Sequence, residues 1–153
     1  MYTEDQIAAF NTIFKDDELL KPMYTETQIA AFRIFIKDAG LSVPKVFDCL
    51  TDRELAAICN GWGPDSWALV IRKRLTRIAG YYEVLAVPHD IRFEFKDGSF
   101  HQANKEFWIN ARKLWFRKHG CKGIWRFRAL KELILLFGCY IVLQIFGRPA
   151  WED

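Results

Sequence analysis

The stretch VPHDIRFEFKDGSFHQANKEFWINARKLW, residues 87–115, determines how we expect the chain to fold. Its second half predicts a long helix from Ser99 to about Lys118, because apolar residues recur there at helical spacing, namely Phe100, Ala103, Phe107, Ala111 and Leu114. The tetrapeptide KDGS is a turn. Residues 81–95 before it fit a helix or a strand, since β-branched side chains are frequent and Pro88 would kink a helix.

Helices are also expected on both sides of this stretch. The first 44 residues are a tandem repeat in which 13 of 22 positions are identical, and each copy begins with a capping box, Thr3 to Gln6 and Thr25 to Gln28. We interpret residues 1–44 as a duplicated amphipathic helix whose second copy packs on the body, with the first as an appendage. Further helices are predicted after Thr51, over 67–78 and over 125–146, so the fold class is all-α.

Composition and charge restrict the function classes. The chain has 153 residues, of which 51% are hydrophobic, and its net charge is +3. Residues 101–131 hold nine lysines and arginines against Glu106 alone, which favours an anionic partner such as lipid headgroups or nucleic acid, although a solvated helix face gives the same pattern. Nucleic acid is the weakest partner, because no reader motif is present and the aromatic residues follow helical core spacing.

The four cysteines do not form a metal-binding pattern. Cys49, Cys59, Cys121 and Cys139 include no CxxC pair, which argues against structural zinc and leaves buried thiols or two disulfides. The polar, acidic N-terminus does not have the pattern of a signal peptide, so we expect an intracellular protein with reduced thiols.

The last predicted helix contains the run LILLFGCYIVLQIF, residues 133–146, with one polar member. A membrane-spanning helix needs about 18 or more apolar residues, so we expect a buried core helix. The alternative is a helix that enters a membrane interface, with the preceding basic residues binding lipid phosphate.

Two short elements suggest a catalytic site. The loop CNGWGP, residues 59–64, has two glycines that let its backbone turn carbonyls toward one point, and His89 is followed directly by Asp90. Carbonyl oxygens with one carboxylate suit calcium, and an imidazole beside the ion suits general base catalysis. Each element is weak alone, because glycine loops are usually turns.

Asn104 strengthens this hypothesis, because it interrupts the apolar stripe of its helix and therefore points toward the core. A buried amide needs hydrogen-bond partners. If the helices before and after KDGS are antiparallel, His89 is a suitable partner; a backbone carbonyl is an equally good one. His101 and His119 are expected at the surface, and Trp62 and Trp67 are expected to pack over the glycine loop.

The segments CNGWGP, HDIRF, ANKEF and FGRPAWED together resemble the phospholipase A2-like proteins of phages and prophages, over residues 58–153. The resemblance implies an antiparallel helix pair with additional N- and C-terminal helices, in a phospholipase A2-like domain over 45–153. It implies calcium held by Asp90 and the carbonyls of Cys59, Gly61 and Gly63. It also implies that His89 activates water against a phospholipid ester and that the Gly61 N–H stabilises the oxyanion.

Two positions depart from the family pattern. Phe93 stands where the family has a tyrosine, and Asn104 aligns with the aspartate that orients the histidine. An amide accepts the imidazole N–H but brings no charge to the imidazolium, which lowers the expected turnover. One carboxylate with carbonyls also predicts weak calcium binding, on the order of 10⁻⁴–10⁻³ M.

Two hypotheses therefore remain. The first is a calcium-dependent lipid ester hydrolase that contacts a phospholipid membrane peripherally, in a bacterial host cytoplasm or a phage particle. The second is an inactive phospholipase-like scaffold, in which residues 1–44 present an amphipathic surface to a protein partner.

Overall fold

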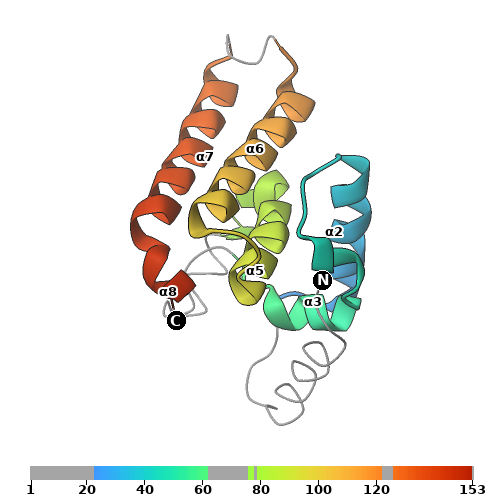
Figure 1. The fold of residues 1–153 in the computed structure, drawn as a ribbon. Coiled ribbons are helices and arrows are strands. Elements are labelled where there is room, and N and C mark those ends of the chain that lie inside the picture. The colour runs from blue at the N-terminus through green and yellow to red at the C-terminus, as the bar shows by residue number, and fades with distance from the viewer. Residues whose placement is uncertain (1–22, 62–75, 78, 122–125, 153) are drawn as a thin grey trace.

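The computed structural model describes residues 23–61, 76–77, 79–121 and 126–152, and this part of the chain is helical with no strand (Figure 1). The all-α prediction is therefore confirmed. The elements in chain order are α2 (Glu26–Asp38), η1 (Lys45–Asp48), α3 (Asp52–Ile58), η2 (Gly80–Leu85), α5 (Ala86–Phe95), α6 (Phe100–His119), α7 (Phe127–Phe146) and α8 (Arg148–Glu152). The first repeat copy and the predicted helix over 67–78 fall largely outside the described residues.

Local capping interactions fix three of the helix starts. In α2 the Thr25 hydroxyl accepts from the Gln28 N–H while the Gln28 side chain accepts from the Thr25 N–H. The same reciprocal pair occurs between Thr51 and Glu54 at α3, as predicted. A third capping box begins α6, where Ser99 pairs with Gln102. Each cap satisfies donors that the first helical turn leaves free.

Residues 80–95 form a 3₁₀ turn, η2, that continues into α5, and the ambiguity between helix and strand is resolved in favour of helix. Pro88 is the third residue of α5. Proline is compatible with a helix at this position, because first-turn N–H groups lack partners in most helices and proline removes only such a group. The chain then reverses at Lys96, whose φ is +49°, and at Gly98, whose φ is +94°.

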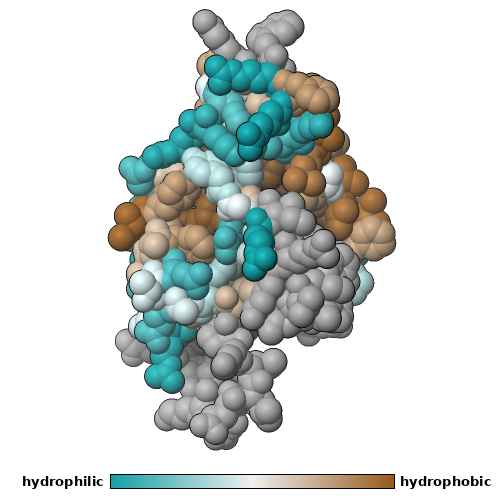
Figure 2. All heavy atoms as spheres, turned by 180° about the vertical axis from the view of Figure 1, so that it is seen from behind, coloured by the Kyte–Doolittle hydropathy of each residue, from teal (hydrophilic) through white to brown (hydrophobic). Residues whose placement is uncertain are grey.

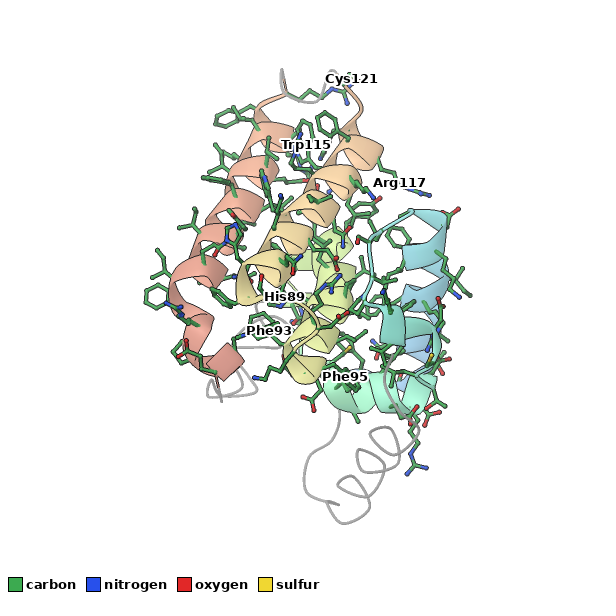
Figure 3. All side chains as sticks on the ribbon, in the orientation of Figure 1. His89, Phe93, Phe95, Trp115, Arg117 and Cys121 are labelled. Carbon is green, nitrogen blue, oxygen red and sulfur yellow. The ribbon has the colours of Figure 1, made fainter. Side chains whose placement is uncertain are left out.

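α5 and α6 form an antiparallel hairpin, and α7 lies against the other side of α6 (Figure 1). Contacts across the hairpin follow its register, with Phe93 near Phe100 and His89 near Asn104. The α6–α7 contact includes Trp115, which is buried and donates its indole N–H to the Ala129 carbonyl at 2.7 Å. Figure 3 shows Trp115 between the two helices.

The second repeat copy packs into this body, as predicted. Tyr24, Ile29 and Ile36 are buried in the same core as α3 and α5. The segment that follows α2 is attached to α6 through Asn110, a buried amide that accepts from the Ser42 N–H and donates to the Ser42 carbonyl, both at 2.8 Å. The Ser42 hydroxyl also donates to Glu106 at 2.9 Å.

The prediction of a buried core helix for the C-terminal apolar run is wrong. In α7 only Ala129 and Leu136 are fully buried. Of the most apolar 18-residue stretch of this helix, 11% is buried. Ile134, Ile145 and Phe146 are more than 60% exposed. By length and composition alone, α7 is the one described helix that is long and apolar enough to cross a membrane, with a mean hydropathy of 1.9. The helix itself was predicted correctly, but its burial would require a covering element that the described residues do not supply.

Candidate active site

The described part of the site lies between the α5–α6 hairpin and the loop that ends α3. His89 and Asp90 are adjacent on α5, and their side chains are 10% and 12% exposed. Figure 3 shows His89 and Phe93 on one side of α5, facing α6 and the C-terminal part of α7. Cys59 ends α3 and Gly61 follows in the loop, whereas Gly63, Trp62 and Trp67 lie outside the described residues.

Asn104 orients the His89 ring. Asn104 is 0% exposed, as its position in the apolar stripe predicted, and its Oδ1 lies 3.1 Å from Nε2 of His89. Its Nδ2 is directed at the Leu143 carbonyl of α7, at 3.4 Å. Because a carbonyl only accepts hydrogen bonds, the amide nitrogen belongs on the Leu143 side, and Oδ1 therefore accepts from His89. This assignment places the imidazole proton on Nε2 and leaves Nδ1 with its lone pair.

Nδ1 of His89 is the nitrogen that this arrangement leaves for chemistry. Asp90 Oδ1 lies 3.9 Å from it, beyond hydrogen-bond distance, and no residue in the described ranges donates to it. A neutral imidazole nitrogen with a lone pair is what a general base requires.

Aromatic rings cover the same histidine. The Phe93 ring centre is 4.4 Å from that of His89 with a tilt of 32°, and Phe107 meets the ring edge-on at 5.7 Å. Trp151 of α8 packs edge-on against Phe93 at 5.1 Å, and the Lys96 ammonium is hydrogen-bonded to the Trp151 carbonyl. The C-terminal helix α8 thus contributes Trp151, which packs against the Phe93 ring that lies on His89.

Asp90 faces the loop after α3. Its Oδ2 accepts from the Asn60 backbone N–H at 3.1 Å, across 30 residues of sequence. Burial and the Asp90 charge together raise the pKa of the Cys59 thiol well above its usual range, so the thiol stays protonated. Burial likewise raises the pKa of the Tyr24 phenol, and the charges of Glu83 and Asp90 add to the effect.

The loop requires a glycine at position 61. Gly61 has φ of +82°, a conformation that side chains rarely adopt, and a Cβ there would lie 2.9 Å from the Thr76 hydroxyl oxygen. The glycine thus lets the backbone pass close to residue 76 on its way past Asp90. This supports the structural part of the glycine-loop prediction, while carbonyl ligation by Cys59, Gly61 and Gly63 stays a prediction.

The donor set at Asp90 suits a hard cation only weakly. Calcium takes six to eight oxygen ligands. Here the Asp90 carboxylate faces the backbone of the loop after α3, and one of its oxygens already accepts a hydrogen bond from the Asn60 N–H. No group of three or more His, Cys, Asp or Glu side chains comes together within the described ranges. Any calcium bound here would depend on carbonyls and water.

Sequence reasoning placed His119 incorrectly, left the state of the cysteines open and did not anticipate one ion pair. His101 is exposed as expected, but His119 is not a surface residue: its side chain is 12% exposed and its Nε2 lies 2.8 Å from Glu132 of α7. The four cysteines, left open between thiols and disulfides, are free. The ion pair of Arg92 with Glu106, which joins α5 to α6, was also not anticipated.

Neither a family model, nor a curated protein, nor a solved structure matches the chain.

Proposed function

We propose that this protein is a phospholipase A2-like lipid ester hydrolase in which His89 is the general base. The observation that carries the proposal is the hydrogen bond from His89 Nε2 to the buried Asn104, which fixes the ring and leaves Nδ1 as the basic nitrogen. The resemblance of the HDIRF and ANKEF segments to phage and prophage phospholipases supports the same assignment. Lipid as the substrate class agrees with the exposed apolar surface of α7.

The chemistry requires a water molecule between Nδ1 and the ester. His89 takes a proton from this water through Nδ1, and the water oxygen attacks the ester carbonyl carbon. The tetrahedral intermediate then collapses as the proton passes from the imidazolium to the leaving alcohol oxygen, which yields a fatty acid and a lysophospholipid. Asn104 acts as a positioning residue throughout, since its oxygen holds Nε2–H in place.

Calcium is part of the proposal at low affinity. Asp90 with the carbonyls of Cys59, Gly61 and Gly63 would hold the ion, and the Gly61 N–H would meet the oxyanion. When bound, calcium would supply positive charge for the developing oxyanion.

The test is fatty-acid release from phospholipid vesicles by the full chain in millimolar calcium. We expect His89→Ala to abolish release, whereas His101→Ala, which removes an exposed histidine from α6, should keep it. The proposal fails if the unmodified protein releases no more fatty acid than His89→Ala.

Asn104 offers a second test that separates catalysis from structure. Asn104→Asp keeps the acceptor for Nε2–H and adds a charge that stabilises the imidazolium, so we expect turnover to rise by more than about tenfold. Asn104→Leu removes the acceptor and should lower turnover, even where circular dichroism shows the same helix content. A purely structural role for Asn104 predicts no increase in either variant.

A second candidate function is a non-catalytic phospholipase-like scaffold, which is favoured by the low exposure of His89. Phe93 lies against the His89 ring, and the His89 side chain is 10% exposed. In this case His89→Ala would leave the biological role intact, and a protein partner would be lost when residues 1–44 are deleted.

A further inference from the structure

A basic cavity lies at the end of the molecule where α6 ends and α7 begins, far along α6 from His89. It is open to solvent, has a volume of about 400 Å³ and is lined by Lys118, His119, Arg126, Arg128, Ala129 and Glu132. A neighbouring cavity of about 220 Å³ shares Lys118, Arg128 and Glu132 and extends to Leu135 and Leu136. Positive side chains thus meet apolar ones along one side of α7.

Glu132 organises the cationic wall of this cavity. Its Oε2 accepts from Tyr82 and Lys118, both at 2.9 Å, and lies 2.8 Å from His119 Nε2. Among the described residues that line the cavity, Glu132 is the only acid, and these contacts already occupy it. Lys118 keeps further N–H donors, because an ammonium group has three.

Arg126 and Arg128 are the cations that this cluster leaves without a partner. Both are exposed, and neither makes an ion pair or side-chain hydrogen bond within the part of the chain that the structure describes. With Lys118 they bring three positive charges to one cavity against the single charge of Glu132. Arginine guanidinium groups bind phosphate oxygens through paired N–H donors, so the cavity suits a phosphate group.

The exposed apolar stripe of α7 runs directly beside this cavity. The stripe comprises Phe127, Leu130, Ile134, Leu135, Phe137, Ile141, Val142, Ile145 and Phe146, all exposed. Arg128 and Leu135 are seven residues apart and so lie on one flank of the helix, where the edge of the stripe meets the second cavity. Figure 2 shows hydrophobic surface along the edge of the molecule beside a hydrophilic cluster at one end. Lys131 adds a cation within the stripe and lies 4.4 Å from the centre of the Phe127 ring.

We propose that this cavity binds the phosphate of an anionic membrane lipid while the apolar stripe of α7 enters the lipid surface. An anionic bilayer meets both features at once, because its headgroups carry negative charge and its interior is apolar. A soluble phosphate compound would account for the cations and leave the stripe in water. The assignment is independent of whether His89 is catalytic.

The experiment is flotation of the full chain with two kinds of vesicle, phosphatidylcholine alone and phosphatidylcholine mixed with phosphatidylglycerol. We expect binding to the anionic vesicles, and a loss of about thirtyfold in the partition coefficient for Arg126→Gln/Arg128→Gln, which is about 1 kcal/mol for each charge. The matched control is Lys45→Gln/Arg53→Gln, which removes the same charge from exposed positions on η1 and α3 and should keep full binding.

A second pair of variants tests the apolar stripe. Ile134→Ser/Ile145→Ser changes exposed side chains of α7, so the fold should persist while vesicle binding falls at least tenfold. Ile34→Ser, at an exposed position on α2, should change nothing. His89→Ala should bind vesicles like the unmodified chain, which separates this proposal from the hydrolase proposal.

Three outcomes would overturn the proposal. One is equal loss of binding in the arginine pair and in its control, which would mean general charge attraction without a site. Another is arginine-dependent binding of inorganic phosphate in calorimetry by a chain that floats with neither vesicle. The third is a stable dimer in sedimentation velocity that Ile134→Ser/Ile145→Ser dissociates while vesicles are not bound.

Discussion

Glu132 should contribute strongly to stability near neutral pH, through its charge. The hydrogen bonds from Lys118, His119 and Tyr82 outweigh partial burial and hold the pKa of Glu132 at about 2, against an ordinary value of 4.5. A difference of this size corresponds to about 3 kcal/mol of folding free energy. Because Lys118 is one-third exposed, solvent screening reduces this figure, and we expect Glu132→Gln to lower the free energy of unfolding by about 2 kcal/mol.

The sign of the pH dependence follows from the lowered pKa. The carboxylate stabilises the folded state fully above pH 4.5, and this contribution disappears as the pH falls toward about 2, where the folded state also takes up the proton. The stability difference between the unmodified chain and Glu132→Gln should therefore shrink over this window.

Urea unfolding followed by circular dichroism at a series of pH values measures this difference. The control is Glu26→Gln in the first turn of α2, whose exposed carboxylate makes no ion pair with any described residue and whose loss should cost less than about 0.5 kcal/mol. The reasoning would be refuted if the difference in free energy of unfolding between the unmodified chain and Glu132→Gln stayed constant as the pH falls. A constant difference would arise from packing rather than from charge.

Two further predictions concern backbone conformation and the α6–α7 contact. Gly61→Ala should destabilise the protein by at least about 1 kcal/mol, since the new Cβ would meet the Thr76 hydroxyl oxygen at 2.9 Å and φ is positive. Gly138→Ala, on α7 with open space around it, should instead stabilise by up to about 1 kcal/mol, and thermal unfolding of both distinguishes them. Trp115→Phe should cost about 1–3 kcal/mol in urea unfolding, because it loses the hydrogen bond to the Ala129 carbonyl and part of a buried ring. A Trp115→Phe protein as stable as the unmodified chain would contradict this account of the contact.

The parts of the fold that sequence reasoning predicted are those determined by neighbouring residues. The capping boxes at Thr25 and Thr51 involve side chains three positions apart, so the helix starts could be located directly. The contact of His89 with Asn104 could also be predicted, because a short turn fixes the register of the two helices that it joins.

The features that were missed depend on contacts between distant segments. His119 looked like a surface residue because its partner, Glu132, belongs to another helix. The apolar content of α7 predicted a helix but not its burial, since hydrophobicity alone does not say what covers a face. Pro88 made α5 difficult to predict, because the effect of a proline depends on its position within the helix. That position is known only once the start of the helix is known.

The bond between Asn110 and Ser42 has a consequence for how the N-terminal duplication can evolve. Asn110 recognises only main-chain atoms of residue 42, the N–H and the carbonyl, which every residue type except proline provides. Substitutions at position 42 therefore keep the attachment and lose only the hydroxyl contact with Glu106. The side chain at position 42 can therefore change while the position of this residue on α6 stays constant, and the constraint falls on Asn110.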